Sequence, residues 1–249
     1  MVHKFHRFLR KSEINDNLAI ILESGGGQLD ASVKLVNICK QYSDSLKVFV
    51  PFYAKSAATV IALSADKLYL GRAGELGPVD PQISHPIQDD MFIQALSIKD
   101  AVDFIEKDVS DEVIKEKLVD QLDTYWIGAS QRAIDQSEEY LNDVIQGSEG
   151  EFARELVENY KDHGYPIDRT RCDELGIPIE NEKSNFEDSL YDVHEEAVDL
   201  YEEENLLYVM TTKDDITTEN KDSVVPDDLS EELKEMLGDG DGNPPNPQT

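Results

Sequence analysis

The stretch KVFVPFYAKSAATVIALSADKLYLG, residues 47–71, decides the fold of this chain. It opens on a short β-branched and aromatic run that Pro51 ends, and it continues into residues 57–63, which are apolar on every side at helix length. A second short apolar run, residues 67–70, stops at Gly71. This pattern predicts a strand, a turn, a buried helix and a second strand.

Ser56 falls at the turn between the first of these strands and the buried helix. The first N–H groups of a helix have no partner within the helix, and the positive end of the helix dipole favours an oxyanion. A serine at this place can therefore act as a nucleophile. A serine before a helix is more often a simple N-cap, so position alone leaves both roles open.

A triple glycine at residues 25–27 follows another fully apolar strand, residues 18–22, and precedes an amphipathic segment over residues 30–42. Glycines between a strand and a helix suit a phosphate cradle, an anion nest or an oxyanion hole. The phosphate loops are disfavoured, because no Gly-Lys-Ser/Thr follows and because Leu29 and Asp30 break the GxGxxG spacing. A glycine turn after one strand and a serine turn after the next indicate an acyl-transfer site.

Four segments resemble one known family: SGGGQLDAS at residues 24–32, VPFYAKSAATVIALSADKLYLG at 50–71, GELGPVDPQI at 74–83 and HGYPIDRTRCDELGIPI at 163–179. In this order and spacing they resemble the serine dehydrogenase proteinase family of the Clp protease and crotonase fold superfamily, which is related to signal peptide peptidase A. The matches cover most of residues 18–179. The resemblance implies an α/β fold, a Clp protease/crotonase-like spiral of repeated ββα and βαβ units, followed here by an acidic C-terminal extension.

The resemblance also implies a serine peptidase site. Ser56 matches the family nucleophile, Gly26 matches the oxyanion-hole glycine of the Clp protease, and the N–H of Ala57 would be the second donor. The expected activity is that of a serine endopeptidase-like hydrolase that cleaves a peptide or unfolded protein through an acyl-enzyme on Ser56. No cofactor or metal is assigned. Because the sequence holds no ATP-binding loop, the peptidase is expected to be independent of ATP by itself.

The sequence leaves four candidates for the general base. Relatives with a Ser-Lys dyad carry the lysine roughly 50 positions after the serine, near Lys107, and a lysine acts as a base only where burial lowers its pKa. His85 has nearly the spacing of the Clp protease histidine but lies in a different motif, and His163 lies in the family-like HGYPI with a possible structural role. We predict a Ser-Lys dyad with Lys107, and we keep as alternatives Lys99, His85 and His163.

Two polar residues near the serine turn receive structural interpretations. Lys55 precedes Ser56 and is interpreted as a surface or partner-facing residue. Asp80 lies between valine and proline in the Gly- and Pro-rich residues 74–86, where an aspartate is most often a turn former, so we favour a role in shaping the loop over a catalytic one.

Composition limits the classes of function. The chain has 249 residues, 39% of them hydrophobic, which suits one large α/β domain with extensions. A net charge of −30 argues against binding to nucleic acids or anionic membranes. Cys39 and Cys172 lack CxxC or metal spacing and are expected to be reduced, buried thiols. Without a signal peptide or an apolar run of membrane-spanning length, we expect a cytoplasmic protein with no membrane insertion from this chain.

The acidity is concentrated at the C-terminus, where residues 181–249 hold 21 acidic and 4 basic side chains. We predict a peptidase domain over residues 1–180, an extension over 181–212 with an acidic helix and an edge strand, and a disordered acidic tail over 213–249. Relatives can carry a membrane segment or a further strand upstream. This chain begins too near its glycine turn to hold either in full, which fits a partial domain or a divergent member.

The middle of the chain is predicted to be helical. A capping box at Ser97 and Asp100 predicts a helix that ends near Lys107, and Ser110 is predicted to open a longer helix whose apolar face runs over residues 113–133. Because Clp-fold relatives assemble through helices of this region, we expect a homo-oligomer. The alternative function is a catalytically inactive Clp-fold scaffold that binds a partner. Acyl-CoA chemistry is disfavoured, since crotonase sites lack a serine nucleophile at this turn.

Overall fold

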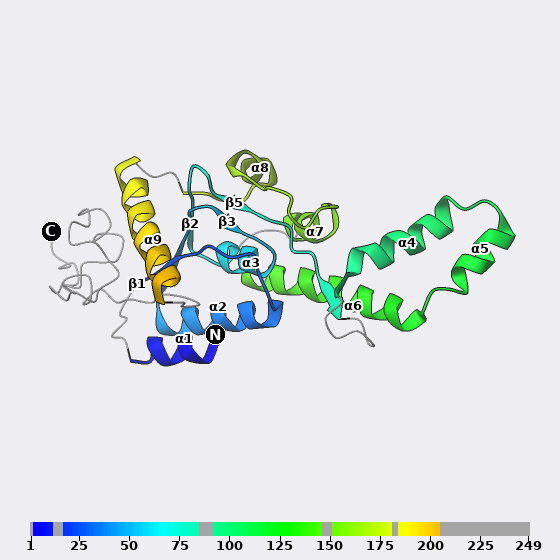
Figure 1. The fold of residues 1–249 in the computed structure, drawn as a ribbon, viewed down its shortest axis with the longest axis horizontal. Helices are drawn as coiled ribbons and strands as arrows, with labels where there is room; N and C mark the ends of the chain where they lie inside the picture. The colour runs from blue at the N-terminus through cyan, green and yellow to red at the C-terminus, as the bar shows by residue number, and fades with distance from the viewer. Residues whose placement is uncertain (1, 12–16, 85–91, 146–150, 181–183, 205–249) are drawn as a thin grey trace, which may run out of the picture.

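The structure is a computed structural model that describes residues 2–11, 17–84, 92–145, 151–180 and 184–204. It is a mixed α/β body from which one helical arm extends (Figure 1). The helices described are α1 (Val2–Leu9), α2 (Leu29–Tyr42), α3 (Ala57–Leu63), α4 (Ala95–Lys107), α5 (Glu112–Val119), α6 (Thr124–Val144), α7 (Glu151–Glu158), α8 (Arg169–Leu175) and α9 (Ser184–Glu204). The strands described are β1 (Asn17–Ile21), β2 (Ser45–Val50), β3 (Tyr53–Ala54), β4 (Lys67–Leu70), β5 (Glu75–Leu76), β6 (Gln82–Ser84) and β7 (Phe92–Gln94).

The sheets are built by repetition of one unit. The main sheet is parallel with strand order β1-β2-β4. After each of its strands the chain adds residues to a second, smaller sheet, in which Ser24 bridges Ala54 and β3 pairs with β5 in parallel. A helix, α2 or α3, then returns the chain to the next strand of the main sheet, as parallel pairing requires. This is the repeated ββα arrangement that the sequence predicted.

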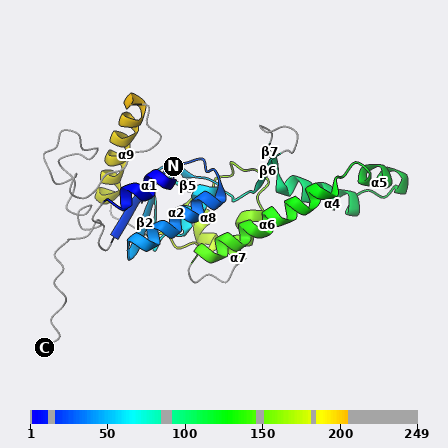
Figure 2. The ribbon, with the colours of Figure 1, turned by 90° about the horizontal axis from the view of Figure 1, so that it is seen from below.

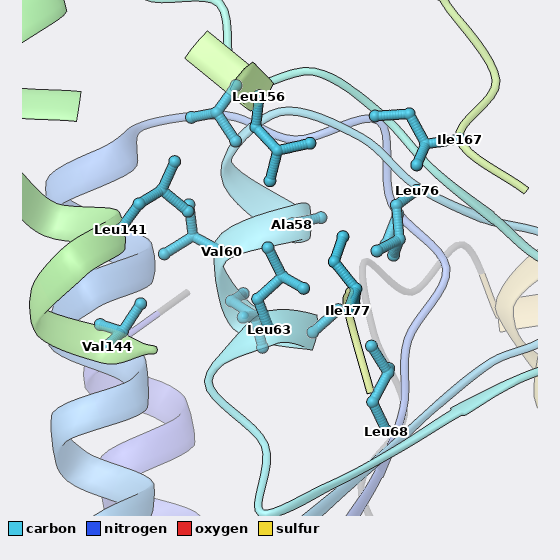
Figure 3. Close-up of a cluster of buried hydrophobic side chains, with 14 of the residues drawn as sticks. Ala58, Val60, Leu63, Leu68, Leu76, Leu141, Val144, Leu156, Ile167 and Ile177 are labelled. Atoms are coloured by element: carbon cyan, nitrogen blue, oxygen red, sulfur yellow. The ribbon is translucent and has the colours of Figure 1, made fainter. Parts of the chain in front are cut away.

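Helix α3 is the most deeply buried helix that the structure describes. All seven of its side chains are buried, as the uninterrupted apolar run predicted. Figure 3 shows Val60 and Leu63 of α3 enclosed by side chains that include Leu141 of α6 and Leu156 of α7. Burial of each such aliphatic side chain contributes roughly 1.5–3 kcal/mol, so the N-terminus of α3 is firmly anchored.

Helix α9 covers the opposite face of the main sheet. The side chains of a strand alternate between its two faces. The residues that meet α9 form a separate apolar cluster around Ala19, Ile21, Phe49, Tyr69 and Leu190. The intervening strand residues face α2 and α3 in the larger core. The acidic helix predicted in the C-terminal extension therefore packs against the sheet and does not stand apart from it.

Helices α4 and α5 with part of α6 form an arm that leads away from the body in both views (Figures 1 and 2). The single helix predicted after Ser110 is interrupted, because the carboxylates of Asp111 and Asp123 accept N–H groups as separate N-caps of α5 and α6. The capping box predicted at Ser97 is also wrong, since α4 begins two residues earlier with Gln94 at the N-cap position.

The burial predicted for the two cysteines is confirmed, and a glycine sets the end of the neighbouring helix α8. Gly176 ends α8 with a φ of +71°, a left-handed conformation that glycine adopts without strain. Cys39 and Cys172 are buried and form no disulfide. Burial raises the pKa of each thiol to about 12, so both are inert at neutral pH.

Other predictions fall outside the described residues. They are the edge strand over 206–212, the tail over 213–249 and the position of His85. Within the described ranges, no helix combines the length and the apolar character needed to cross a lipid bilayer.

Candidate active site

Three equivalent turns of the repeated unit lie side by side. The glycine turn follows Ser24, the serine turn follows Ala54, and a third turn at Gly77 follows β5. Backbone hydrogen bonds join them, from the Lys55 N–H to the Ser24 carbonyl at 2.9 Å and from the Gly77 N–H to the Ala54 carbonyl at 3.1 Å. The turns follow parallel strands, and active sites of α/β sheets lie at the carboxyl ends of such strands.

Ser56 has a strained backbone. Its φ is +52° and its ψ is −121°. Ser56 is the only non-glycine residue with a positive φ in the described part of the chain. Such a conformation costs about 1–3 kcal/mol. The Ser56 side chain makes no capping hydrogen bond to α3, so the simple N-cap interpretation does not account for it. A serine on a strained strand-to-helix turn is how α/β-hydrolases expose their nucleophile.

Gly26 packs directly against Ser56. Its φ is +106°, and a Cβ at this position would lie 2.7 Å from the Lys55 carbonyl oxygen, 2.9 Å from Ser56 Cβ and 3.3 Å from the Ala57 nitrogen. Only glycine fits this approach of one turn to the other. The structure therefore brings together the three residues that the sequence predicted for the nucleophile and the oxyanion hole.

The backbone donors around Ser56 differ in their partners. The Ala58 N–H donates to the Lys55 carbonyl and the Thr59 N–H to the Ser56 carbonyl, both at 2.9 Å. Ala57 is the first residue of α3, so its N–H has no acceptor within the helix. The Gly26 N–H donates to the Ser24 hydroxyl at 3.1 Å, and a substrate oxygen would have to displace that hydroxyl.

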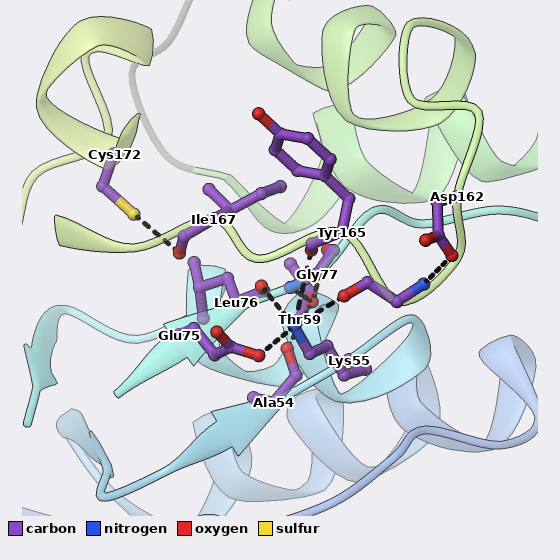
Figure 4. A network of polar contacts seen from close by, with 11 residues as sticks. Ala54, Lys55, Thr59, Glu75, Leu76, Gly77, Asp162, Tyr165, Ile167 and Cys172 are labelled. Atoms are coloured by element: carbon purple, nitrogen blue, oxygen red, sulfur yellow. Dashed lines mark hydrogen bonds and ion pairs between the residues drawn. The ribbon is translucent and has the colours of Figure 1, made fainter. Parts of the chain in front are cut away.

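Lys55 is largely buried, which corrects its interpretation as a surface residue. Its side chain is 12% exposed, and its Nζ lies 2.5 Å from a carboxylate oxygen of Glu75. The same ammonium donates to the carbonyls of Leu76 at 3.1 Å and Tyr165 at 3.4 Å (Figure 4). A Cβ on Gly77 would collide with the Lys55 side chain, so glycine provides its space. Lys55 thus ties the serine turn to β5 and to the loop that follows α7.

Thr59 is a positioning residue that the sequence analysis did not single out. Its hydroxyl lies 2.7 Å from the Ala54 carbonyl and 2.8 Å from the Gly77 carbonyl, and it accepts the Gly77 N–H at 3.2 Å. It therefore joins the strand before Ser56 to the third turn. A signal existed, because Thr59 is the only polar residue in AATVIAL.

Asp80 and His163 form a polar pair beside these turns. His163 Nδ1 lies 3.6 Å from Asp80 Oδ2, and the Asp80 side chain is 4% exposed. Burial raises the pKa of Asp80, while the nearby His163 opposes that shift. The other Asp80 oxygen, Oδ1, has no hydrogen-bond partner among the described residues. The His163 loop is tied to the serine turn, since Lys55 Nζ also contacts the Gly164 carbonyl at 3.5 Å.

The other predicted bases lie in different surroundings. Lys107 is the last residue of α4, its side chain is 64% exposed, and Nζ lies 3.0 Å from an Asp103 oxygen. That hydrogen bond raises the pKa of Lys107, whereas a lysine base needs a lowered one. Figures 1 and 2 show α4 leading away from α3. Lys99 is ion-paired with Glu158 of α7, and His85 lies outside the described residues.

Comparison with known proteins gives a family and relatives. The model of the ClpP-like SDH-type serine proteinase family matches residues 2–220. The uncharacterized protein MJ1495 of Methanocaldococcus jannaschii is 30% identical over 178 residues, which are 70% of this chain and 55% of the relative. The uncharacterized protein MJ0137 of the same organism is 27% identical over 194 residues, 76% of this chain and 61% of the relative. The chain thus spans little more than half the length of these relatives.

One solved structure is similar at a low level. It is a mutant of the 1510-N membrane-bound stomatin-specific protease in complex with a substrate peptide. The TM-score is 0.47 and the sequence identity 17%, over 76% of this chain and 73% of that one.

Proposed function

The chain belongs to the ClpP-like SDH-type serine proteinase family, the family that its motifs resemble, and on that premise we propose that it is a serine-type peptidase with Ser56 as its nucleophile. The observation that carries the proposal is the backbone of Ser56, held at a φ of +52° against Gly26. Strain of this kind persists only where the surrounding fold over-determines it, and it concentrates at functional sites. Here the buried helix α3 and the glycine turn impose it.

The geometry supports acyl transfer to a peptide substrate. Ser56 Oγ attacks the scissile carbonyl carbon, and the oxyanion that forms accepts the N–H groups of Ala57 and Gly26, the latter in exchange for Ser24 Oγ. Collapse of this intermediate breaks the peptide C–N bond, releases the amine with the proton taken from Ser56, and leaves an ester on Ser56. Water then attacks the ester and frees the serine.

For the general base we propose His163, oriented by Asp80. Its Nδ1 lies 3.6 Å from the buried carboxylate without a hydrogen bond to it. We propose that this contact shortens when substrate binds, so that the carboxylate fixes the imidazole tautomer and leaves Nε2 to take the proton of the serine. The ties from Lys55 to the loop of His163 support the choice. Lys107 remains the competing candidate, against which its exposure and its raised pKa argue.

The test is the rate at which a fluorophosphonate labels Ser56, followed by intact mass. We expect His163→Ala to lower the rate about 10²-fold or more, as removal of a general base does, and Lys107→Ala to leave it within about twofold. Lys117→Ala, at an exposed position of α5, serves as the matched lysine control. Loss of labelling in Lys107→Ala alone would restore the Ser-Lys dyad. A wild-type protein that is folded but never labelled would exclude the peptidase and favour the inactive scaffold.

We propose a second copy of the chain as the partner of the arm. Helix α5 has no buried residue, and the side chains of Val113, Ile114 and Val119 are each at least half exposed. An eight-residue helix is marginal without packing partners. A two-fold interface buries the same surface on both copies, so the exposed apolar side chains of α5 can be covered by those of a second copy.

Light scattering after gel filtration tests this interface. We expect wild-type protein to elute as an oligomer and Ile114→Glu to elute as a monomer, because a carboxylate would be desolvated at the centre of the contact. Glu116→Gln, at an exposed position of the same helix, is the control and should keep the wild-type mass. An unchanged mass in Ile114→Glu would exclude α5 from the interface.

A further inference from the structure

Glu23 lies where β1 leads into the glycine turn. Ala19 and Ile21 face α9, and Glu23 comes two residues after Ile21. Because side chains of a strand alternate between its two faces, the Glu23 side chain faces α9 as well. The backbone on both sides of it is fixed, since Leu22 and Ser24 donate their N–H groups to carbonyls in β2 and β3 at 2.8 and 3.1 Å. An acidic side chain is thereby held under a helix, three residues before Gly26.

The Glu23 carboxylate joins two other elements. One of its oxygens lies 2.5 Å from Nε2 of His194 in α9. The carboxylate also bonds to Tyr53 of β3. The pKa of the Tyr53 phenol is raised, first by burial and then by the charge and the hydrogen bond of Glu23. Tyr53 is three residues before Ser56. The carboxylate therefore contacts the strand that leads to the nucleophile while it belongs to the strand that leads to the glycine turn.

His194 is placed to serve this carboxylate. Its side chain is 9% exposed, and its ring centroid lies 5.5 Å from that of Phe52. Its Nδ1 is buried without a hydrogen-bond partner among the described residues, which leaves the bond from Nε2 to Glu23 as its polar contact there. A buried imidazole with one partner orients that partner strongly, because breaking the bond would leave two polar groups unsatisfied.

Helix α9 is itself fixed to the ends of the neighbouring strands. The Tyr191 hydroxyl donates to the Pro51 carbonyl at 3.0 Å, just beyond β2. Arg72, just beyond β4, is ion-paired with Glu187 and Asp188. The position of His194 is therefore set by the same sheet edge from which the serine and glycine turns arise.

We propose that His194 and Glu23 are positioning residues for the reaction: His194 orients the Glu23 carboxylate, which holds the glycine turn against β3 and keeps the Gly26 N–H beside Ser56. The proposal rests on the proposed function, because the oxyanion of that reaction gives the Gly26 N–H its role. It makes α9 part of the catalytic unit, although α9 lies in the acidic extension that the sequence analysis separated from the peptidase domain.

The test uses three variants of the full chain. His194→Phe keeps a ring beside Phe52 but removes the donor, His194→Gln keeps a donor near the place of Nε2, and Asp192→Asn changes an exposed residue of α9 as the control. Two quantities are measured: the maximal rate and the half-saturating concentration of fluorophosphonate labelling, and hydrogen exchange of the peptide over residues 22–28 by mass spectrometry.

In His194→Phe we expect the maximal labelling rate to fall about tenfold at an unchanged half-saturating concentration, and exchange in residues 22–28 to rise about tenfold, as loss of one charged hydrogen bond implies. His194→Gln and Asp192→Asn should behave as wild type. The proposal is overturned if His194→Phe changes neither quantity, if His194→Gln is as impaired as His194→Phe, or if exchange rises equally throughout the chain. Absence of labelling in wild type would refute the peptidase, while the exchange data would still decide whether α9 holds the turn.

Discussion

Replacing Ser56 with glycine is expected to abolish activity and to stabilise the fold at the same time. Loss of the hydroxyl should lower peptide hydrolysis by about 10⁴–10⁶-fold, the range found when a serine nucleophile is removed. The free energy of unfolding should rise by about 1–2 kcal/mol, because glycine adopts the φ of +52° without the strain that a Cβ imposes. Urea denaturation and a peptidase assay measure the two effects.

Two control variants separate strain from the loss of a side chain. Ser56→Ala should be equally inactive but no more stable than wild type, since alanine keeps the Cβ. Ser64→Gly, at the other end of α3, should be destabilising, because Ser64 has an ordinary helical φ of −80° and its buried hydroxyl bonds to Ile61. If Ser56→Gly were no more stable than Ser56→Ala, the backbone conformation of Ser56 would not lower the free energy of unfolding. The hypothesis that the protein loses stability at Ser56 in order to be active would then be refuted.

The serine turn could be predicted from the sequence because its signals are local. The apolar run 57–63 fixes α3, β2 ends just before Pro51, and Ser56 falls between them. The short strand β3, which directly precedes the serine turn, was not predicted. The glycine turn is equally local, and the repetition of the ββα unit places it beside Ser56. Only the backbone strain of Ser56 and the close approach of Gly26 needed the structure, since both depend on how neighbouring units pack.

The surroundings of the site depend on contacts that are distant in sequence. Asp80 meets His163, and Lys55 meets Tyr165, across more than 80 residues that no local pattern connects. The prediction of Lys107 used spacing along the chain, but spacing does not reveal that α4 leads away from the body. The charge of α9 masked its apolar face, which includes Leu190 and packs on the sheet. Topology decided each of these placements.

Lys55→Met is expected to lower the free energy of unfolding by about 2–4 kcal/mol. Removing one partner of a partly buried ion pair leaves the other uncompensated, and the estimate is kept below the full range for buried pairs because the Glu75 side chain is 33% exposed. The carbonyl of Tyr165 would lose the Lys55 donor as well, whereas that of Leu76 would keep the N–H of Ile167. Lys67→Met, an exposed lysine at the start of β4, is the control and should change stability by less than about 0.5 kcal/mol.

A double-mutant cycle with Glu75→Gln shows whether the pair or the lysine alone matters. If the ion pair dominates, the two single variants should each be destabilised and the double variant should cost less than their sum, by about 1–3 kcal/mol of coupling. If the carbonyl contacts dominate, Glu75→Gln alone should cost little and the effects should add. A Lys55→Met protein as stable as Lys67→Met would contradict the burial of Lys55 and return it to the surface role that its position beside Ser56 first suggested. Lys55 also binds the loop that carries His163. Lys55→Met should therefore loosen that loop and slow the labelling of Ser56, so that the stability of the serine turn and its reactivity fall together.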